Sequence, residues 1–243
     1  LMAKLAGEEL RDVPYYGILE TKVGGADCVI SQTGFTGEKG YEIYVRDAHE
    51  NAEKMWNAVL EAGEEFGLMV IAPAHHRRIA AGILSWGQDL DHETSPFQVN
   101  LSYQVPRNKA ADYIGKEALE KQRAIIDEGK APFKMKMVGI TLGGKEITDY
   151  APDFWIVTDT DENEVGFVTS PWWSPELETN IALAWVPWDA SEVGTKYMVK
   201  LPDEYSESPG VAVDAEVVDV PFRESVNPNK REVQAAKGLD YAD

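Results

Sequence analysis

The part of the chain after Ala131-Pro132 restricts the fold more than any other feature. From there, short apolar runs alternate with turn residues, and no helical periodicity interrupts them. Short strands at this spacing are typical of a small antiparallel barrel, because closing the sheet removes its exposed edges. We predict strands at residues 135–142, 155–158, 164–169, 181–186, 197–201 and 212–218. The polar tail that follows them, around 227–231, is expected to be extended.

The earlier part of the chain mixes helical and strand patterns. Helices are predicted at residues 1–9, 47–66, 74–84 and 116–126, and strands at 13–19 and 27–32 and around 41–46. Gly24-Gly25 is expected to form the hairpin turn between the first two strands. Asp47, followed by Glu50 three residues later, fits a capping box at the start of the second helix. Together these patterns indicate an α+β protein with domains at 1–126 and 131–222.

A glycine-rich segment leads into the strand at 41–46. In this strand Tyr41, Ile43 and Val45 alternate with polar residues, which places Glu42 on the opposite face. A carboxylate beside such a turn is suited to a ligand edge that carries two N–H donors. A phosphate loop is not indicated, because the Gly-Lys-Ser/Thr ending is missing.

Arg78 opens an otherwise apolar helical run. An arginine in that position pairs with a carboxylate, either within the protein or on a ligand, and the sequence leaves both alternatives open. In the segment that follows, Trp86 is a candidate for stacking on a flat ring, with core packing as the alternative. Asp89 and Asp91 are candidates for acid, base or capping roles. The Trp-Trp pair in 169–175 is expected to lie in a loop that fills an interface.

The composition argues against several kinds of site and partner. The formal net charge of −19 repels phosphate backbones and anionic lipids, so we expect no nucleic-acid and no membrane partner. The single cysteine, Cys28, excludes an internal disulfide and a cysteine-based zinc cluster. His75 and His76 are adjacent on a predicted helix and point about 100° apart, so no metal site is expected. No signal peptide is visible, which favours a cytoplasmic location.

Several segments, taken in order, resemble motifs of the folate-dependent aminomethyltransferase family, which is typified by the glycine cleavage system T-protein. The similarity extends over roughly residues 1 to 222. The segments are Thr33-Gly34-Phe35-Thr36-Gly37-Glu38-Lys39-Gly40-Tyr41-Glu42-Ile43, residues 78–91 with 95–97, residues 112–119, residues 166–170 with 174–175, and residues 180–184. The resemblance implies T-protein-like folate-binding α/β domains followed by a small antiparallel β-barrel.

The resemblance also implies a tetrahydrofolate site. Glu42 is similar to the glutamate that binds the pterin ring, and Arg78 to the folate-site arginine. Phe35 stands where the family usually has a tyrosine, and Trp86 replaces another tyrosine near the ring. Ala80 replaces the usual glutamate after the arginine. The family's catalytic aspartate belongs to an N-terminal part that we do not find here, so no catalytic residue is named, and we expect the chain to be the C-terminal portion of a longer protein.

The implied activity is T-protein-like aminomethyl transfer to tetrahydrofolate. Its partner would be a small-molecule one-carbon donor, or a lipoyl carrier protein in a true T-protein. The segment at 83–91 is closer to demethylating relatives, so a tetrahydrofolate-dependent demethylase acting on dimethylsulfoniopropionate or an aryl methyl ether is an alternative. A non-catalytic folate-binding module and the folate domain of a larger flavin-dependent oxidase are further alternatives.

Overall fold

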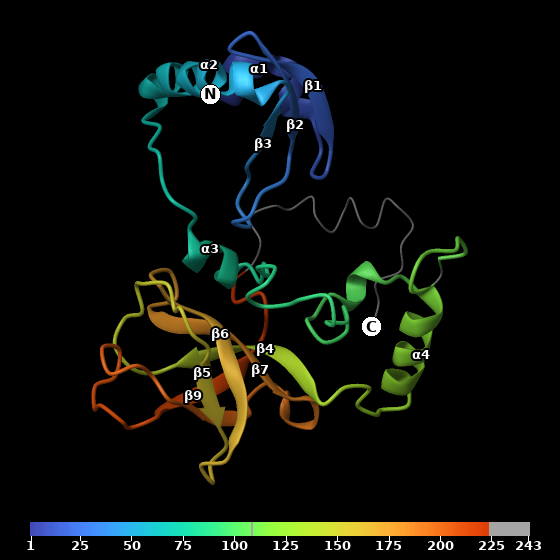
Figure 1. The fold of residues 1–243 in the computed structure, drawn as a ribbon, viewed down its shortest axis with the longest axis vertical. Coiled ribbons are helices and arrows are strands. Elements are labelled where there is room, and N and C mark those ends of the chain that lie inside the picture. Colours follow the sequence, from blue (N-terminus) through green and yellow to red (C-terminus); the bar gives the residue numbers. More distant parts are fainter. Residues whose placement is uncertain (108, 224–243) are drawn as a thin grey trace. The chain divides into compact units, whose positions relative to one another are not determined.

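The computed structural model describes residues 1–107 and 109–223, which form two compact units (Figure 1). The first unit contains residues 1–74, and the described part of the second contains residues 75–107 and 109–223. The predicted tail around 227–231 lies outside the described residues.

The first unit is a three-stranded antiparallel sheet packed against helices. Its elements are α1 (Met2–Ala6), η1 (Glu8–Asp12), β1 (Ile18–Val23), β2 (Ala26–Ser31), β3 (Glu42–Val45), α2 (Ala48–Gly63) and η2 (Glu64–Phe66). The strand order is β1-β2-β3. Gly24 and Gly25 form the predicted hairpin turn with φ of 59° and 81°, values that favour glycine. The core of this unit contains Val23, Cys28 and Ile30.

The second unit begins with helices and continues into a barrel. The helical elements are α3 (His75–Ala80), η3 (Ser102–Gln104) and α4 (Lys116–Asp127), and η4 (Trp188–Ala190) lies within the barrel sequence. The strands are β4 (Met135–Leu142), β5 (Trp155–Thr158), β6 (Glu164–Ser174), β7 (Thr179–Pro187), β8 (Lys196–Val199) and β9 (Val213–Val218). They close in the order β4-β7-β6-β5-β8-β9, and every pairing is antiparallel. The predicted α+β class and the predicted barrel are therefore confirmed.

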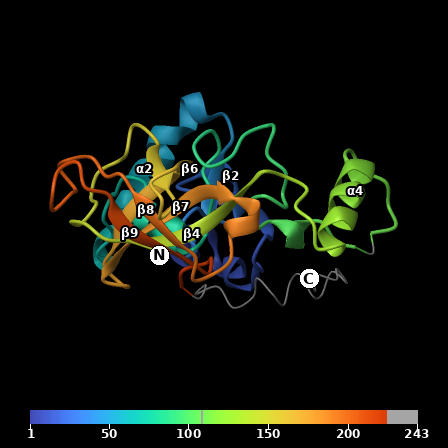
Figure 2. The same ribbon diagram turned by 90° about the horizontal axis from the view of Figure 1, so that it is seen from below.

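The barrel wall separates two apolar clusters. Ile140, Val157 and Val199 are among the residues that fill its interior. The outer face of β4, β6 and β7 forms a second cluster with Ile79 and Ala80 of α3. Both helices of this unit lie outside the barrel, and α4 lies to one side of it in both views (Figures 1 and 2). The strands therefore bury one apolar face inside the barrel and, next to α3, a second face outside it.

Several predicted boundaries were wrong. The first strand begins at Ile18 rather than at residue 13. The helix predicted at 74–84 ends at Ala80, because Gly82 adopts a left-handed φ of 67° that breaks the helical repeat. The helix predicted at 47–66 is α2 followed by the 3₁₀ turn η2.

Two predictions about side chains and loops were also wrong. The capping box does not form, because Asp47 is itself left-handed and its side chain makes no capping bond. The segment 169–175 is not a loop, since β6 continues to Ser174. Its Trp172 stacks on His75 of α3 at 5.3 Å between ring centroids, so this tryptophan does fill an interface, between α3 and the barrel wall.

None of the helices described at residues 1–107 and 109–223 combines the length and apolar character needed to cross a bilayer.

Candidate functional site

Glu42 is the first residue of β3 and pairs with Ser31 of β2. The predicted alternation is confirmed, because Tyr41, Ile43 and Val45 pack against the core of the first unit while Glu42 is exposed. Its Oε2 accepts hydrogen bonds from the Thr33 hydroxyl and from the Tyr44 hydroxyl, the latter at 3.4 Å. Oε1 has no bond to any of the described residues, so the carboxylate is held in one orientation with one oxygen open.

The glycine-rich turn before β3 presents an aromatic ring. Phe35 is 46% exposed. Gly37 lies two residues further on at a φ of 73°, and the Glu38 amide donates to the Thr36 hydroxyl at 3.3 Å. Phe35 therefore lies in the turn that precedes β3, the strand whose first residue is Glu42.

Arg78 is buried in the second unit, with 1% of its surface exposed. A guanidinium has five N–H donors, and each of its three nitrogens here makes hydrogen bonds to described protein groups. They go to His75 Nδ1 at 3.3 Å, the Ile83 carbonyl at 3.0 Å, Asp89 at 2.8 Å, Gln88 at 3.4 Å and Ser170 at 2.8 Å. Of the two alternatives for Arg78, this geometry supports the structural ion pair. A direct ligand contact would require one of these bonds to open.

Asp89 is the partner that the sequence did not single out for Arg78. Its side chain is fully buried and accepts the Arg78 bond at 2.8 Å and the Ser85 amide at 2.7 Å. The hydroxyls of Thr169 and Ser170, both on β6, donate to it at 2.6 Å each. The one available signal was that a buried arginine needs a carboxylate, and no local pattern favoured Asp89 over Asp91. The Arg78–Asp89 pair fastens α3 and the segment at 83–91 to the barrel.

Trp86 lies on the segment that this ion pair holds. Its side chain is 61% exposed, and its ring meets His92 edge-on at 4.9 Å between centroids. Gly87, with a φ of 80°, makes the turn that follows. The indole ring is thus accessible, and it lies on a segment that the buried hydrogen bonds of Asp89 hold in place.

His75 connects α3 to the barrel. Its ring is stacked on Trp172 and lies 5.4 Å from the ring of Tyr150, measured between centroids. Because Nδ1 accepts the Arg78 bond, the imidazole is neutral in this arrangement. Burial lowers the pKa of His75, and the Arg78 cation lowers it further, against a smaller opposing effect of Asp89. The pKa of His76 is also lowered, chiefly by burial and then by Arg77 and Arg223.

These lowered pKa values predict a loss of stability in mild acid. Below the ordinary histidine pKa of about 6.5, the unfolded chain takes up protons that the folded chain refuses, so the free energy of unfolding falls as the pH falls. We expect this fall between about pH 7 and pH 5.5, above the range in which most carboxylates titrate. His75→Asn, which keeps a neutral acceptor, should make the fall shallower in urea denaturation followed at each pH.

The exposed His92 provides the control for this measurement. His92→Asn removes an exposed imidazole of the same unit, and its slope of unfolding free energy against pH serves as the comparison. A slope for His75→Asn as steep as that of the parent would contradict the assigned role of His75.

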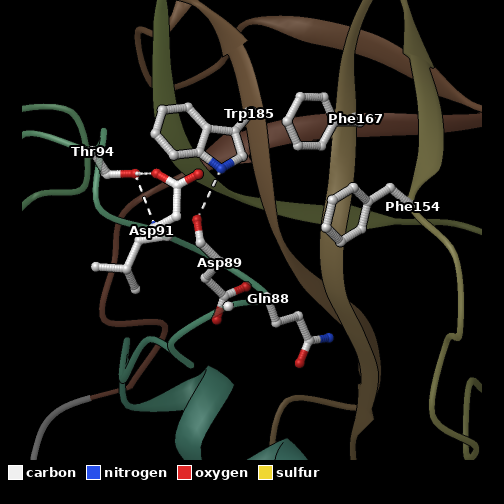
Figure 3. A pocket seen from close by; sticks show the side chains of 9 residues that line it. Gln88, Asp89, Asp91, Thr94, Phe154, Phe167 and Trp185 are labelled. Carbon is white, nitrogen blue, oxygen red and sulfur yellow. Dashed lines mark hydrogen bonds between the residues drawn. The ribbon is translucent and has the colours of Figure 1, made fainter.

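A pocket of about 270 Å³ opens beside the segment that carries Trp86 (Figure 3). Its lining consists of Gly87, Gln88, Asp89, Leu90, Asp91, Thr94, Phe154, Phe167 and Trp185. The Trp185 indole N–H donates to the Asp89 carbonyl at 3.0 Å, which ties the two sides of the pocket together.

The four residues expected at the folate site divide between the two units. Glu42 and Phe35 lie in the first unit, and Arg78 and Trp86 lie in the second. Within the described residues, no three His, Cys, Asp or Glu side chains are grouped so that they could hold a metal ion.

Comparison with known proteins places the chain in a family. Residues 1–109 match the model of the GCVT N-terminal domain, and residues 136–223 match that of the glycine cleavage T-protein C-terminal barrel domain. The aminomethyltransferase of Geobacillus sp. (strain WCH70) is 32% identical over 225 residues, which are 91% of this chain and 57% of that protein. That of Caldanaerobacter subterraneus subsp. tengcongensis is 31% identical over 202 residues, 82% of this chain and 50% of the relative.

A solved structure supports the same fold. The glycine cleavage system aminomethyltransferase T from Bartonella henselae superimposes with a TM-score of 0.67 at 23% identity, over 88% of this chain and 54% of that one. The chain therefore belongs to the glycine cleavage T-protein family, and it spans about half the length of the curated relatives that it matches.

Proposed function

We propose that this chain provides a tetrahydrofolate-binding part of a one-carbon transferase of the aminomethyltransferase type. The observation that carries the proposal is the Glu42 carboxylate, which is exposed at the start of β3 and oriented by Thr33 and Tyr44. Membership of a family whose relatives are named aminomethyltransferases supports the reaction class.

The Glu42 side chain fits one edge of a pterin. That edge carries a ring amide N–H and an amino group, and a carboxylate accepts from both through its two oxygens. The open Oε1 can take one donor, while Oε2 keeps lone-pair capacity beside its two hydroxyl partners. Phe35, 46% exposed, supplies an apolar ring in the turn that precedes β3. The site residues therefore suit a flat, hydrogen-bonding heterocycle.

Few acid–base groups are needed for this chemistry. Tetrahydrofolate, when bound, supplies the N5 amine that accepts the one-carbon unit. The contribution of this chain would be to fix the pterin through Glu42 and to keep the Trp86 segment in place through Arg78 and Asp89. Positioning of this kind lowers a barrier mainly by supplying orientation in advance.

Glu42→Gln tests the proposed folate contact. The substitution replaces one acceptor oxygen with an N–H₂ donor that faces the donor edge of the ring, so tetrahydrofolate should bind about tenfold more weakly, or about 1.4 kcal/mol. Calorimetric titration of the protein with tetrahydrofolate measures this. Glu20→Gln, on β1, removes a similarly exposed carboxylate and should leave the affinity unchanged. Equal affinities for the parent and Glu42→Gln would remove Glu42 from the site.

The product identifies the donor class. Methylene-tetrahydrofolate formed from an aminomethyl donor, presented by a lipoyl carrier protein, would support aminomethyl transfer. Methyl-tetrahydrofolate formed from a sulfonium compound or an aryl methyl ether would replace that reading with demethylation. Tight folate binding without turnover of any of these donors in the full-length protein would support a non-catalytic module.

A further inference from the structure

The turn at residues 85–90, which carries Trp86, closes on itself. The amide of Gly87 donates to the Leu90 carbonyl at 2.8 Å, and Trp86 and Leu90 form an isolated β-bridge. A second backbone bond of 2.8 Å runs from the amide of Asp89 to the first residue of the turn. Any group that holds one part of this turn therefore also restricts where Trp86 can lie.

One support of the turn is the indole of Trp185 on β7. Its N–H donates to the Asp89 carbonyl at 3.0 Å, across 96 residues of sequence. Only 8% of Trp185 is exposed, and it belongs to the apolar cluster on the outer face of the barrel wall, where its ring stacks on Phe167. Because β7 pairs with β4 on one side and β6 on the other, this donor has little freedom to move.

The other support comes from an irregularity in β6. The register between β6 and β7 shifts between Val168 and Ser170, which leaves Thr169 as the extra residue of a β-bulge. A bulged residue is unpaired in the ladder of strand hydrogen bonds and can bond to other groups. Here the Thr169 carbonyl accepts the side-chain amide of Gln88 at 2.8 Å. The bulge therefore supplies a second point at which the barrel holds the turn.

The ring of Trp86 lies on the part of the turn that these bonds leave open. Gln88 and Asp89 are bonded to the barrel, whereas Trp86 is 61% exposed and meets only the edge of His92 among the printed ring contacts. A ring that is already held in place loses little conformational freedom when a flat ligand stacks on it, and the lower ordering cost increases affinity. The barrel can thus affect ligand affinity without touching the ligand.

We propose that Trp185 and Gln88 are positioning residues for Trp86, and that they hold its indole where a flat heterocyclic ligand stacks on it. The inference rests on the proposed function, since it takes the pterin of tetrahydrofolate as that ligand. The support of Trp86 by the barrel is nevertheless measurable without any ligand.

Fluorine NMR measures this support directly. In protein labelled with fluorotryptophan, the Trp86 resonance is identified by its loss in Trp86→Leu. We expect that resonance to shift or broaden in Trp185→Phe, which keeps an aromatic ring without the N–H donor, and in Gln88→Met, which keeps the length of the side chain. Trp188→Phe and Gln104→Met make the same exchanges elsewhere in the second unit and should leave the resonance in place. A Trp86 resonance unchanged in both Trp185→Phe and Gln88→Met would overturn the proposal.

A double-mutant cycle with tetrahydrofolate shows whether the support acts through Trp86. Trp185→Phe alone should weaken tetrahydrofolate binding by about threefold to tenfold, and it should have no further effect in the Trp86→Leu background. A loss of the same size in both backgrounds would indicate a general structural effect of Trp185→Phe and would overturn the positioning role. Unchanged affinity in Trp185→Phe alone would also overturn it.

The two measurements separate this inference from the proposed function. If the parent protein binds no tetrahydrofolate while the Trp86 resonance responds to Trp185→Phe and Gln88→Met, the proposed function fails and the support of Trp86 by the barrel is confirmed. If the parent binds tetrahydrofolate and the resonance does not respond, the inference fails and the proposed function is retained.

Discussion

Asp89→Ala is expected to lower the free energy of unfolding of the second unit by about 3–5 kcal/mol, the cost of removing one partner from a buried ion pair. The guanidinium of Arg78 would remain 1% exposed without its counter-charge, and the hydroxyls of Thr169 and Ser170 would lose their acceptor. Urea denaturation followed by tryptophan fluorescence measures this, since every tryptophan except Trp56 lies in the second unit.

A matched exposed pair gives the control. Arg107 bonds Asp127 through two contacts of 2.8 Å, but these side chains are 38% and 45% exposed. Water screens such a pair, so Asp127→Ala should cost much less stability than Asp89→Ala. A double-mutant cycle with Arg78→Met should show that the two losses at Arg78 and Asp89 are not additive. A cost for Asp89→Ala as small as that for Asp127→Ala would contradict the role of the Arg78–Asp89 pair in holding α3 and the segment 83–91 to the barrel.

Gly166→Ala should destabilise the barrel by about 3 kcal/mol, the upper end of the usual cost of overpacking. A Cβ added at Gly166 of β6 would lie 2.0 Å from the carbonyl oxygen of Trp185 on β7. That atom belongs to the backbone of a neighbouring strand, so no side-chain rotation relieves the clash and the strands themselves must shift. The midpoint of urea unfolding reports the effect.

Gly143→Ala is the control for this substitution. A Cβ at Gly143 meets its nearest neighbour, the Cβ of Val213, at an ordinary 3.6 Å. We expect a change of less than about 0.5 kcal/mol, as for substitutions that touch nothing critical. Similar midpoints for the two variants would mean that the barrel accommodates a side chain at Gly166.

The barrel strands were predictable where local chemistry was sufficient. The bounds predicted for β4 and β5 agree with the structure, because apolar runs there end at clear turn residues. The continuation of β6 through Trp172 was missed because Pro171 suggested a turn. In the structure the register shifts between Val168 and Ser170, just before the proline, and an irregularity of this kind is where a strand tolerates proline.

The candidate site, like the barrel, could be predicted from the sequence only in part. The alternation at 41–45 was sufficient to expose Glu42, because a period of two fixes which face each side chain takes. The role of Arg78 could not be inferred from its neighbours in the chain. Its partner Ser170 lies 92 residues away, and the segment 85–91 contains two competing aspartates, Asp89 and Asp91.

The sequence by itself determined the family resemblance, the α+β class, the barrel and the exposed carboxylate of Glu42, since each depends on residue order or on local periodicity. Only the tertiary structure decided that Asp89 neutralises Arg78 and that Phe154, Phe167 and Trp185 line one pocket together with Asp91. These contacts join separate strands and loops, and the free energy of burying a charge or a ring depends on which distant groups the fold brings to it.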